Sequence, residues 1–473
     1  MDAQGKAAAG VVVVGAGFSG TIAAIQLRRR LPGWLDVYLV ERSGEFARGI
    51  AFANSQVPHL LNVRAANMGA FADDTGHFER WLRVNAPQWP DEVLRTEAGN
   101  FATRRIFGKY LQATLHDEIA ASGGTVHLLT GEVRALAHDE NGCILHLDGG
   151  RTLAARGVVL ATGSLPVGQP CGDVEFHDPW TPLAVAGLRP DAPVLIVGTG
   201  LTMVDLVHAL DAQGFRGPVL ALSRRGLLPL AHEPVPQAWP TPEFGEDARG
   251  AVLALLRAVR ADIRAAAARN IGWRAVIDSL RPVTAALWRG LPAEERARFL
   301  RHIRPYWDVH RHRMAPPAAA LINRLRAEGR LRILRGRVRE VRCGEGQAAV
   351  VYDACPSGMR ENLAVQRVIY ATGLQGAGAS GGLVAALLAS GQARLDGQGL
   401  GLDVTPALNL VDAAGKAVPN LWALGPIVRG TFWECLAVPD IRQQADQLAR
   451  EIAEALDAPG GCAGESLVGT FVI

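Results

Sequence analysis

The feature that most constrains the fold is the segment VVVVGAGFSGTIAAIQLRRR, residues 11–30. Its apolar run is typical of a fully buried parallel strand, and the apolar periodicity after the last glycine predicts a helix. Gly15 permits a tight turn, Gly17 lets backbone N–H groups approach a pyrophosphate, and Gly20 allows the helix to pack closely on the strand. The next predicted strand, LDVYLVER, ends in Glu41, where a carboxylate that binds ribose belongs. The segment therefore predicts a βαβ unit that binds an adenine dinucleotide. The alternative is a glycine turn followed by a solvated glutamate.

A second glycine turn lies in VLIVGTGLTMVDLVHAL, residues 194–210. Gly198 and Gly200 keep the spacing of the first turn, but Met203 replaces the third glycine. The following predicted strand ends in SRR, residues 223–225, where the first unit has an acid. A carboxylate would repel the 2′-phosphate of NADP, whereas a guanidinium binds it as a fork and a hydroxyl donates to it. The pattern predicts an altered site for NADPH, and solvated arginines at a strand end are the alternative.

Two apolar strands that end in Ala-Thr-Gly complete the pattern, GVVLATGS at 157–164 and RVIYATGL at 367–374. Each would bring the chain back beneath one nucleotide-binding unit, and the small residues allow a close approach of the backbone. The predicted fold class is α/β, with two Rossmann-like dinucleotide-binding domains and a helical insertion.

The length of the chain bears on its domain organisation. A chain of 473 residues is too long for one ordinary core, which favours two domains of roughly 150–250 residues. We predict a discontinuous first domain at 1–185 and 400–473, and a second domain at 190–399. A stretch rich in Pro and Gly, residues 165–180, separates them.

A helical insertion is predicted inside the second domain, at about 247–313. This stretch is rich in Ala, Leu and Arg, and its helical periodicity is broken near Pro282, Pro292 and Pro305. We expect the insertion to cover the active-site cleft and to select the substrate.

The run RPYWDVHRHR ends this insertion. Its arginines and histidines would bind an anionic substrate or line the NADPH channel, and ion pairs with acids are the alternative. His310 and His312 would share one face of a strand, but no third ligand is evident. No metal site is therefore predicted.

Composition narrows the class of protein. Hydrophobic residues make up 49% and charged residues 20%, with no apolar run of about 18 residues, which argues against a membrane protein. The net charge of +3 comes from scattered arginines and gives no nucleic-acid footprint. The six cysteines never form C-x-x-C, so we expect reduced thiols in a cytoplasmic protein and no dithiol reductase. The first ten residues lack the apolar region of a signal peptide.

Longer stretches carry a family resemblance. They are RGIAFANSQVPHLLNVRAANMGAFADDTGHFERWL, FATRRIFGKYL, GTGLTMVDL, LSRRGLLP, LRHIRPYWDVHRHRMAP and LWALGPIVRGTFWECLAVPDIRQQA. Together with the first glycine turn, they span nearly the whole chain. The chain resembles the FAD/NAD(P)-binding flavoprotein monooxygenases that include FAD-dependent urate hydroxylases and the nitrosuccinate-forming aspartate N-monooxygenases. The stretches are specific to that family but not to one substrate.

The resemblance implies a function. FAD would occupy the first domain and NADPH the second, and oxygen would be transferred through a C4a-(hydro)peroxyflavin formed with O₂. We therefore predict an NADPH- and FAD-dependent monooxygenase that hydroxylates a small nitrogen-rich metabolite, with urate-type ring hydroxylation ahead of amino-acid N-hydroxylation. The alternatives are an NADPH-dependent flavin reductase or oxidase without oxygen insertion, and a non-enzymatic redox sensor that binds nucleotides. A homodimer is left open.

The resemblance also implies roles for individual side chains. It places PHLLNV, residues 58–63, near the isoalloxazine ring, with His59 and Asn62 as hydrogen-bond partners. Arg429 would bind a urate oxygen or an amino-acid carboxylate, and Trp433 would stack on a planar substrate. These four are the predicted catalytic residues. A core histidine, an asparagine that caps its own backbone and a tryptophan that only packs are the structural alternatives.

A predicted helix entered through Pro439 and Asp440 would direct its positive N-terminus at the flavin, although Asp440 as an ordinary cap explains the same residues. The predicted cofactor-binding residues are Gly15, Gly17, Phe18, Ser19, Gly20, Glu41, Arg48, Asn62, Val133, Ala161, Thr162, Gly163, Gly198, Gly200, Leu201, Thr202, Ser223, Arg224, Arg225, Ala371, Thr372, Gly373, Gly425, Pro426 and Asp440.

Overall fold

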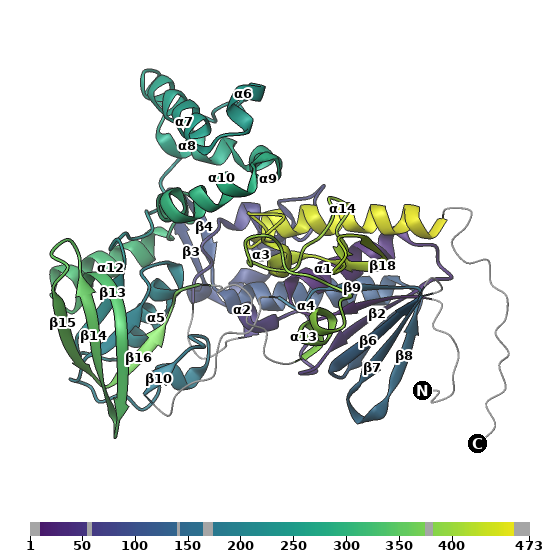
Figure 1. Ribbon diagram of the computed structural model, residues 1–473, viewed down its shortest axis with the longest axis horizontal. Coiled ribbons are helices and arrows are strands. Elements are labelled where there is room, and N and C mark those ends of the chain that lie inside the picture. Colours follow the sequence, from purple (N-terminus) through teal and green to yellow (C-terminus); the bar gives the residue numbers. More distant parts are fainter. Residues whose placement is uncertain (1–9, 54–58, 140–141, 164–173, 374–381, 458–473) are drawn as a thin grey trace.

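The computed structural model describes residues 10–53, 59–139, 142–163, 174–373 and 382–457. Two α/β units lie side by side, and a group of helices stands above their junction (Figure 1). One unit contains a six-stranded sheet and the other a seven-stranded sheet. The predicted α/β fold, with two Rossmann-like units and a helical insertion, is confirmed.

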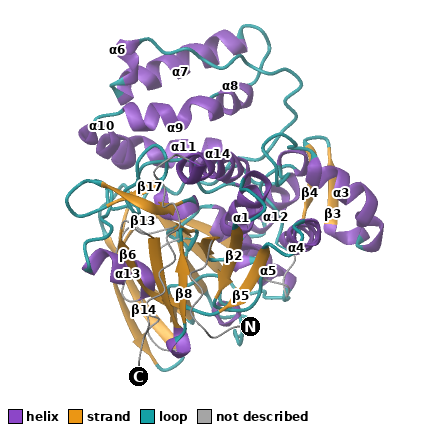
Figure 2. Cartoon of the chain, turned by 90° about the vertical axis from the view of Figure 1, so that its right-hand side faces the viewer, coloured by secondary structure: helices purple, strands orange, loops and turns teal. Residues whose placement is uncertain are grey.

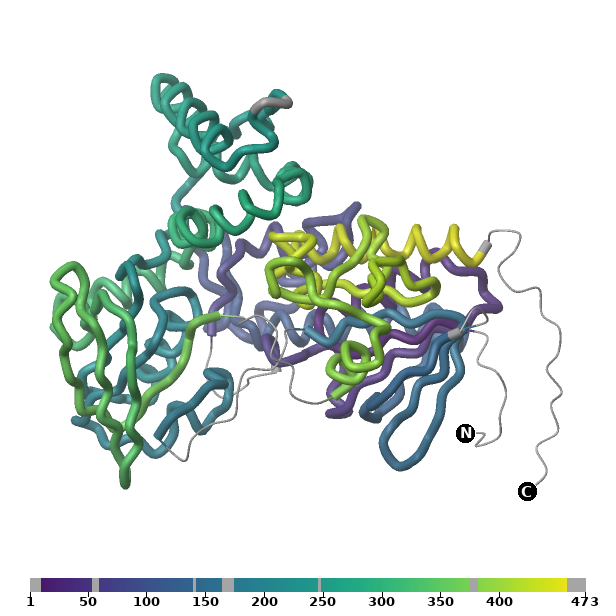
Figure 3. Tube along the Cα trace, in the orientation of Figure 1, coloured from purple at the N-terminus to yellow at the C-terminus, as the bar shows by residue number. Residues whose placement is uncertain are grey.

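The first unit is built on a sheet in the order β17-β18-β9-β1-β2-β5. Its strands are β1 (Gly10–Val14), β2 (Asp36–Glu41), β5 (Val126–Thr130), β9 (Gly157–Leu160), β17 (Asn409–Val411) and β18 (Ala417–Ala423). All neighbours are parallel except β17, which runs antiparallel to β18. Val12 in the middle of the sheet aligns with Tyr38 and Val158. Strands β17 and β18 come from late in the chain and complete a sheet begun by its first residues (Figure 3).

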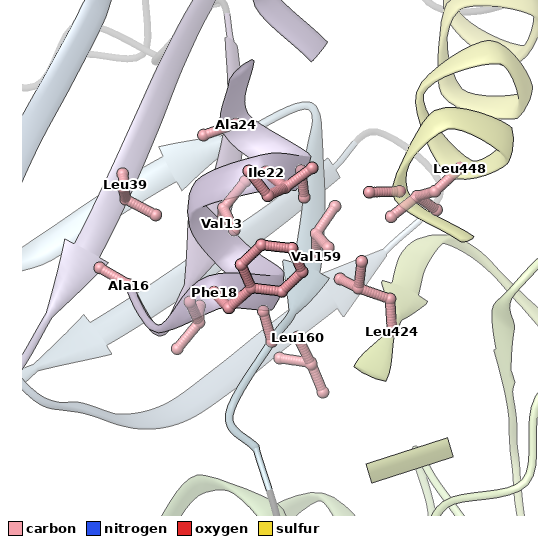
Figure 4. Close-up of a cluster of buried hydrophobic side chains, with 14 of the residues drawn as sticks. Val13, Ala16, Phe18, Ile22, Ala24, Leu39, Val159, Leu160, Leu424 and Leu448 are labelled. Carbon is pink, nitrogen blue, oxygen red and sulfur yellow. The ribbon is translucent and has the colours of Figure 1, made fainter. Parts of the chain in front are cut away.

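Both faces of this sheet are covered, which explains why β1 is apolar along its whole length. Helix α1 (Phe18–Arg30) packs against α4 (Arg104–Ala121) and α14 (Val438–Asp457). A small sheet of β6 (Val133–Asp139), β7 (Gly142–Leu147) and β8 (Thr152–Ala155) lies away from α14 (Figure 1). Figure 4 shows Val13, Ile22, Val159 and Leu448 close together where the sheet, α1 and α14 meet, and all four are completely buried.

The second unit has the sheet order β10-β16-β11-β12-β13-β14-β15. The strands are β10 (Glu175–Phe176), β11 (Val194–Val197), β12 (Val219–Ser223), β13 (Leu331–Gly344), β14 (Gln347–Ala354), β15 (Arg360–Val365) and β16 (Arg367–Tyr370). The first five strands in sheet order are parallel to their neighbours. Strand β13 then pairs antiparallel with β14, and β14 pairs antiparallel with β15. Helices α5 (Leu201–Ala212) and α12 (Pro316–Ala327) pack together.

The helical insertion runs from α6 to α11. Its helices are α6 (Glu246–Arg249), α7 (Val252–Ala267), α8 (Trp273–Ser279), α9 (Arg281–Gly290), α10 (Ala293–Arg298) and α11 (Arg304–Arg311), with a π-helical turn at Phe299–Ile303. Pro282 and Pro305 each take the second position of a helix, and Pro292 caps α10. The predicted breaks are therefore confirmed, because a proline without an N–H is tolerated at a helix start. Figure 2 shows α9 and α10 above α11 and α14.

Shorter elements connect these parts. They are α2 (Gly49–Ala53), α3 (His77–Asn85), the hairpin of β3 (Val93–Thr96) and β4 (Gly99–Ala102), and α13 (Gly382–Ala389). Helix α13 contacts β6 of the first unit. Much of the Pro- and Gly-rich stretch predicted between the domains, residues 165–173, lies outside the described residues. No described helix is long and apolar enough to cross a membrane.

Candidate functional site

The first glycine turn is closed by backbone contacts that leave no room for side chains. Gly15 has a φ of +100°, and a Cβ on it would lie 2.6 Å from the carbonyl oxygen of Ala161. A Cβ on Gly20 would collide with the carbonyl oxygen of Gly15. The Ala-Thr-Gly strand end therefore approaches the turn as closely as its small residues predict, and α1 begins directly after Gly17.

Glu41 is fixed beside this turn at the end of β2. Its Oε2 accepts a hydrogen bond of 2.9 Å from the backbone N–H of Ala16, and its Oε1 accepts from the N–H and Oγ of Ser43 at 3.1 and 3.0 Å. The N–H of Gly131, two residues before Val133, donates to the backbone oxygen of Glu41. The backbone of Glu41 is therefore joined to the segment that leads into Val133, and hydrogen bonds from Ala16 and Ser43 orient its carboxylate.

Two further segments reach the same turn. Gly49, which follows Arg48, has a φ of +58°, and a Cβ on it would lie 2.8 Å from the Cα of Gly17. Gly425 has a φ of +80°, and its added Cβ would collide with the Oγ of Ser19. The segments that carry Arg48 and Pro426 are thereby brought to the start of α1.

The donor set and the open space around this turn fit an adenine dinucleotide. A Cβ on Gly163 would meet nothing within 4 Å, and one on Gly17 would meet only the Cα of Gly49, at 3.6 Å. Free backbone N–H groups at the start of a helix attract a pyrophosphate, and a carboxylate at the end of the second strand suits a ribose hydroxyl.

The second glycine turn repeats the first in part. Gly198 has a φ of +120°, and its added Cβ would collide with the carbonyl oxygen of Ala371. Gly200 caps α5 with a φ of −83°, and its added Cβ would meet nothing within 4 Å. Neither its backbone angle nor a neighbour requires glycine there, so the open space fits a phosphate at the start of α5. Gly373, at the end of the second Ala-Thr-Gly, likewise borders open space.

The three side chains of the SRR segment at the end of β12 have different surroundings. Thr199 donates to the carbonyl oxygen of Leu227 at 2.6 Å, so Ser223 is the donor in its 2.9 Å contact with the Thr199 hydroxyl. Arg225 donates to Tyr306 in α11 at 3.1 Å. Arg224 is exposed, and its side chain makes no hydrogen bond or ion pair with another described residue. Arg224 is therefore the member of the three that is open to a 2′-phosphate.

His59 and Asn62 lie where the two α/β units meet. His59 is buried, and its ring centroid is 6.5 Å from that of His208 in α5. Burial, with the charge of Arg104 nearby, lowers the pKa of His59 to about 4, so its ring is neutral near pH 7. The carbonyl oxygen of Asn62 accepts a 2.9 Å hydrogen bond from His232. A small pocket next to His59 is lined by residues of α5, including Thr202 and Asp205. Residues between 179 and 185, including Trp180, line it as well.

Arg429 and Trp433 form a buried pair beneath the helical insertion. Arg429 is 5% exposed, and its guanidinium carbon lies 4.5 Å from the centroid of the Trp433 ring. Trp288 and Phe299 also pack on that ring, at 4.8 and 5.4 Å. Both Nε of Arg429 and Nε1 of Trp433 are buried without a hydrogen-bond partner among the described residues. The Trp433 ring is covered by these neighbours, whereas the Nε of Arg429 has no acceptor among the described residues.

Acidic residues pair with three of the other arginines around this pair. Arg281 donates to both carboxylate oxygens of Asp440, at 2.8 and 2.9 Å. Arg311 lies 3.6 Å from Glu434, and Arg304 lies 3.3 Å from Asp308. These are the paired cations.

No carboxylate of a described residue lies within ion-pair distance of Arg429. Burial, with the charge of Arg304 nearby, lowers the pKa of Arg429. Arg429 is therefore a buried cation without an acidic partner among the described residues.

The positions of several of these residues were visible in the sequence, but their pairing was not. Asp440 is predicted as a cofactor ligand or a helix cap, and in the structure it lies in the first turn of α14 with both carboxylate oxygens bound by Arg281. Histidine spacing suggested a strand at His310 and His312, but the first of them lies in α11, with its Nδ1 2.7 Å from the oxygen of Tyr306. Among the described residues, no group of three His, Cys, Asp or Glu side chains is placed to hold a metal ion.

Sequence reasoning missed the contact between Arg104 and Asp205 altogether. Arg104 begins α4, and its Nη2 lies 2.6 Å from the Oδ2 of Asp205 in α5. Asp205 belongs to the segment of the second glycine turn, and an acid on the buried side of an apolar helix was the available signal.

Comparisons with known proteins agree with this architecture. Residues 12–165 match a family model described as FAD-NAD(P)-binding. The search of curated proteins gives no match.

Solved structures share the fold over nearly the whole chain. The ornithine N-hydroxylase of Kutzneria sp. 744, solved with reduced FAD, NADP⁺ and L-ornithine, is 15% identical with a TM-score of 0.61, over 93% of this chain and 98% of that chain. The L-lysine 6-monooxygenase of Pseudomonas syringae is 15% identical with a TM-score of 0.62, over 95% and 100%. The cadaverine monooxygenase of Erwinia amylovora, bound to FAD, is 13% identical with a TM-score of 0.62, over 96% and 98%. At these identities the likeness shows the fold alone.

Proposed function

We propose that this protein is an NADPH- and FAD-dependent monooxygenase that hydroxylates the amine nitrogen of a small amino acid carrying a side-chain anion. The observation that carries the choice of substrate is Arg429, a buried guanidinium without a carboxylate partner among the described residues. A buried unpaired charge is costly, so a site that keeps one is suited to an anionic ligand. The two glycine turns and the shared fold support the choice of cofactors.

FAD would be held by the first glycine turn and by Glu41 beside it. The N-terminus of α1 takes the pyrophosphate, and Glu41 takes the ribose hydroxyls. NADPH is held by the second turn, with Gly200 at the pyrophosphate and Arg224 on the 2′-phosphate. When bound and reduced, the flavin supplies the oxygen-activating chemistry.

Arg429 anchors and orients the substrate. Its free Nε lies on the edge of the guanidinium that can bind a carboxylate in a two-point fork, and Trp433 fixes the plane of that fork. The unpaired positive charge also favours the neutral amine over the ammonium form, because a like charge disfavours protonation. A neutral amine has the free electron pair that N-hydroxylation requires.

The structural neighbours are an ornithine N-hydroxylase, an L-lysine 6-monooxygenase and a cadaverine monooxygenase. Each of these three compounds has two amine groups, and only ornithine and lysine also have a carboxylate. A buried unpaired arginine would repel a second ammonium group and attract a carboxylate. A dicarboxylic amino acid therefore fits the site better than a diamine.

Urate-type hydroxylation, which the sequence placed first, draws less support from the geometry. It calls for a planar ring stacked on Trp433, but Arg429, Trp288 and Phe299 already pack on that indole. Arg429 would still accept a urate anion, so urate belongs in the same assay.

The test is to purify the protein with its flavin and follow NADPH oxidation, peroxide and product mass with aspartate, glutamate, ornithine, cadaverine and urate. We expect a dicarboxylic amino acid to stimulate NADPH oxidation with little peroxide and to gain one oxygen atom. NADPH consumption matched by peroxide with every compound would instead identify an oxidase. Failure to bind FAD or to oxidise NADPH would leave only the non-enzymatic nucleotide sensor.

Arg429→Lys and Arg429→Gln sharpen the test. Both keep much of the side-chain volume, but lysine retains the charge without the fork and glutamine removes the charge. We expect the KM for the acidic substrate to rise in both, and more in glutamine. An unchanged KM in both variants would contradict the assignment of Arg429.

A further inference from the structure

A buried ion pair joins the two α/β units. Arg104 is the first residue of α4 in the FAD unit, and Asp205 lies in α5 of the NADPH unit. Their Nη2 and Oδ2 atoms are 2.6 Å apart, and the two side chains are only 13% and 8% exposed. The pair is therefore a buried charge contact between two elements far apart in the sequence, unlike an exposed pair whose partners are screened by water.

The pair lies next to the phosphate turn of the NADPH unit. Asp205 follows Gly200, the cap of α5, by five residues, and it lines the same pocket as Thr202. A force on Asp205 therefore acts on the first turns of α5. Any shift of this helix relative to α4 moves the predicted pyrophosphate site with it.

The backbone of Arg104 is held within the FAD unit, where its N–H donates to the carbonyl oxygen of His59 at 2.8 Å. Its guanidinium carbon lies 4.9 Å from the centroid of the Trp180 ring, in the segment that follows β10 of the second sheet. Thr103, the residue before it, caps α4 by accepting from the N–H of Ile106. Arg104 thus projects from a helix end that is held in the FAD unit, and its guanidinium reaches Asp205 and Trp180 of the second unit.

We propose that the Arg104–Asp205 pair is a positioning device that holds α5, and the NADPH bound at its N-terminus, at the separation from the FAD unit needed for flavin reduction. This inference rests on the proposed function. In that reaction NADPH loses a hydride and the flavin gains it. Such transfer depends strongly on alignment, and a misplacement of about 1 Å can slow a reaction by up to about a hundredfold.

Two single variants remove the pair in different ways. Asp205→Asn keeps the shape of the side chain and removes its charge, and Arg104→Met keeps an unbranched chain against Trp180 and removes the guanidinium. We expect each to slow anaerobic bleaching of the flavin by saturating NADPH by about tenfold to a hundredfold. Reoxidation of dithionite-reduced protein by O₂, which does not use NADPH, should keep its rate. FAD content should also be unchanged.

A second readout does not depend on turnover. In the nucleotide-free variants, hydrogen exchange at the first turns of α4 and α5 should be faster than in the wild type, because the contact that joins them is lost. Arg104→Lys restores a charge to the pair, so it should recover part of both the bleaching rate and the protection.

Arg29→Met is a control within the FAD unit. Arg29 donates to Glu118 of α4 at 3.0 Å, so this pair does not join the two units. We expect it to leave reduction, reoxidation and exchange at α5 unchanged.

The outcomes separate this inference from the proposed function. A wild-type protein that binds no flavin, or whose flavin NADPH cannot bleach, refutes the proposed function itself. If the wild type is reduced normally, unchanged bleaching in both Asp205→Asn and Arg104→Met overturns the positioning role. An equal loss of reduction, reoxidation and FAD content also overturns it, since it would make the pair a general support of the fold.

Discussion

The two glycine turns of this chain both join a buried strand to a helix, but the helices pack against the turns differently. In the first, Gly20 lies so close to Gly15 that a side chain cannot be added. In the second, the corresponding place is filled by Met203, which is completely buried in the core of the NADPH unit. What both turns keep is the first glycine, whose positive φ and contact with an Ala-Thr-Gly carbonyl admit no side chain. The third glycine therefore serves helix packing, whereas the first serves the turn.

The ends of the second strands differ in a complementary way. Glu41 accepts three hydrogen bonds from the first turn and its own loop. In the second unit Ser223 braces the turn through Thr199, Arg225 reaches the insertion, and Arg224 stays exposed. The acid is thus held ready for a neutral ribose, and the arginine is left open for a phosphate, which is the chemical difference between the two nucleotides.

The largest expected effect comes from giving the first turn the side chain of the second. Gly20→Met would drive a Cβ into the carbonyl oxygen of Gly15, a backbone atom that cannot move aside. We expect no folded protein with bound flavin. Expression, circular dichroism and the flavin absorbance of the purified fraction measure this, and a yellow, folded variant would show that α1 can shift.

The reciprocal change should be milder. Met203→Ala leaves a cavity in the core of the NADPH unit, where the side chain is fully buried. The expected loss is about 2–5 kcal/mol of unfolding free energy, with FAD still bound. Denaturant unfolding of the flavin-loaded protein gives the value. A loss below about 1 kcal/mol would mean that the second turn tolerates a small residue as the first does.

Arg224→Ala tests the difference between the strand ends. Hydrogen bonds to a charged group contribute about 1.5–3 kcal/mol, so the KM for NADPH should rise about tenfold to a hundredfold. The KM for NADH should change little, because NADH has no 2′-phosphate. Equal changes for both nucleotides would contradict the assignment, and Arg225→Ala is the neighbouring control.

Gly200→Ala separates nucleotide binding from folding. The added Cβ meets no protein atom within 4 Å and the backbone φ is −83°, so stability should change by less than about 0.5 kcal/mol. The methyl group would occupy the space predicted for the pyrophosphate, so NADPH should bind more weakly. Thermal unfolding and NADPH titration measure the two effects. If a stable variant still bound NADPH tightly, the pyrophosphate could not be assigned to the space beside Gly200.

The contact between the units should make the stability of the protein depend on pH. Burial raises the pKa of Asp205 from 3.8 to about 6, and Arg104 opposes the shift. Arg104 of α4 contacts this carboxyl group, His59 lines the same pocket as Asp205, and His208 lies three residues further along α5.

A raised carboxyl pKa stabilises the folded state in its protonated form. This contribution is present below about pH 4 and is lost as the pH rises through about 6. Urea unfolding between pH 4.5 and 7.5 should therefore show a fall that Asp205→Asn removes. A fall of the same size in the variant would assign the titration to another group.

Much of the fold and of both nucleotide turns was predictable because the signals are local. A positive φ at Gly15 and Gly198, a four-residue apolar strand and a helix that follows at once are requirements on neighbouring residues. The prolines that begin the helices of the insertion obey a local rule as well.

The sequence by itself therefore determined the two Rossmann-like units, their turns and the different strand ends that follow them. Only the tertiary structure decided which charges meet. The unpaired charge of Arg429 and the pairing of Arg104 with Asp205 depend on elements far apart in the chain, whose side chains are interchangeable in composition until the fold brings them together. Charge pairing acts over a few ångströms in space and leaves no periodic pattern along the sequence. For this reason only the three-dimensional structure identifies the ion pairs.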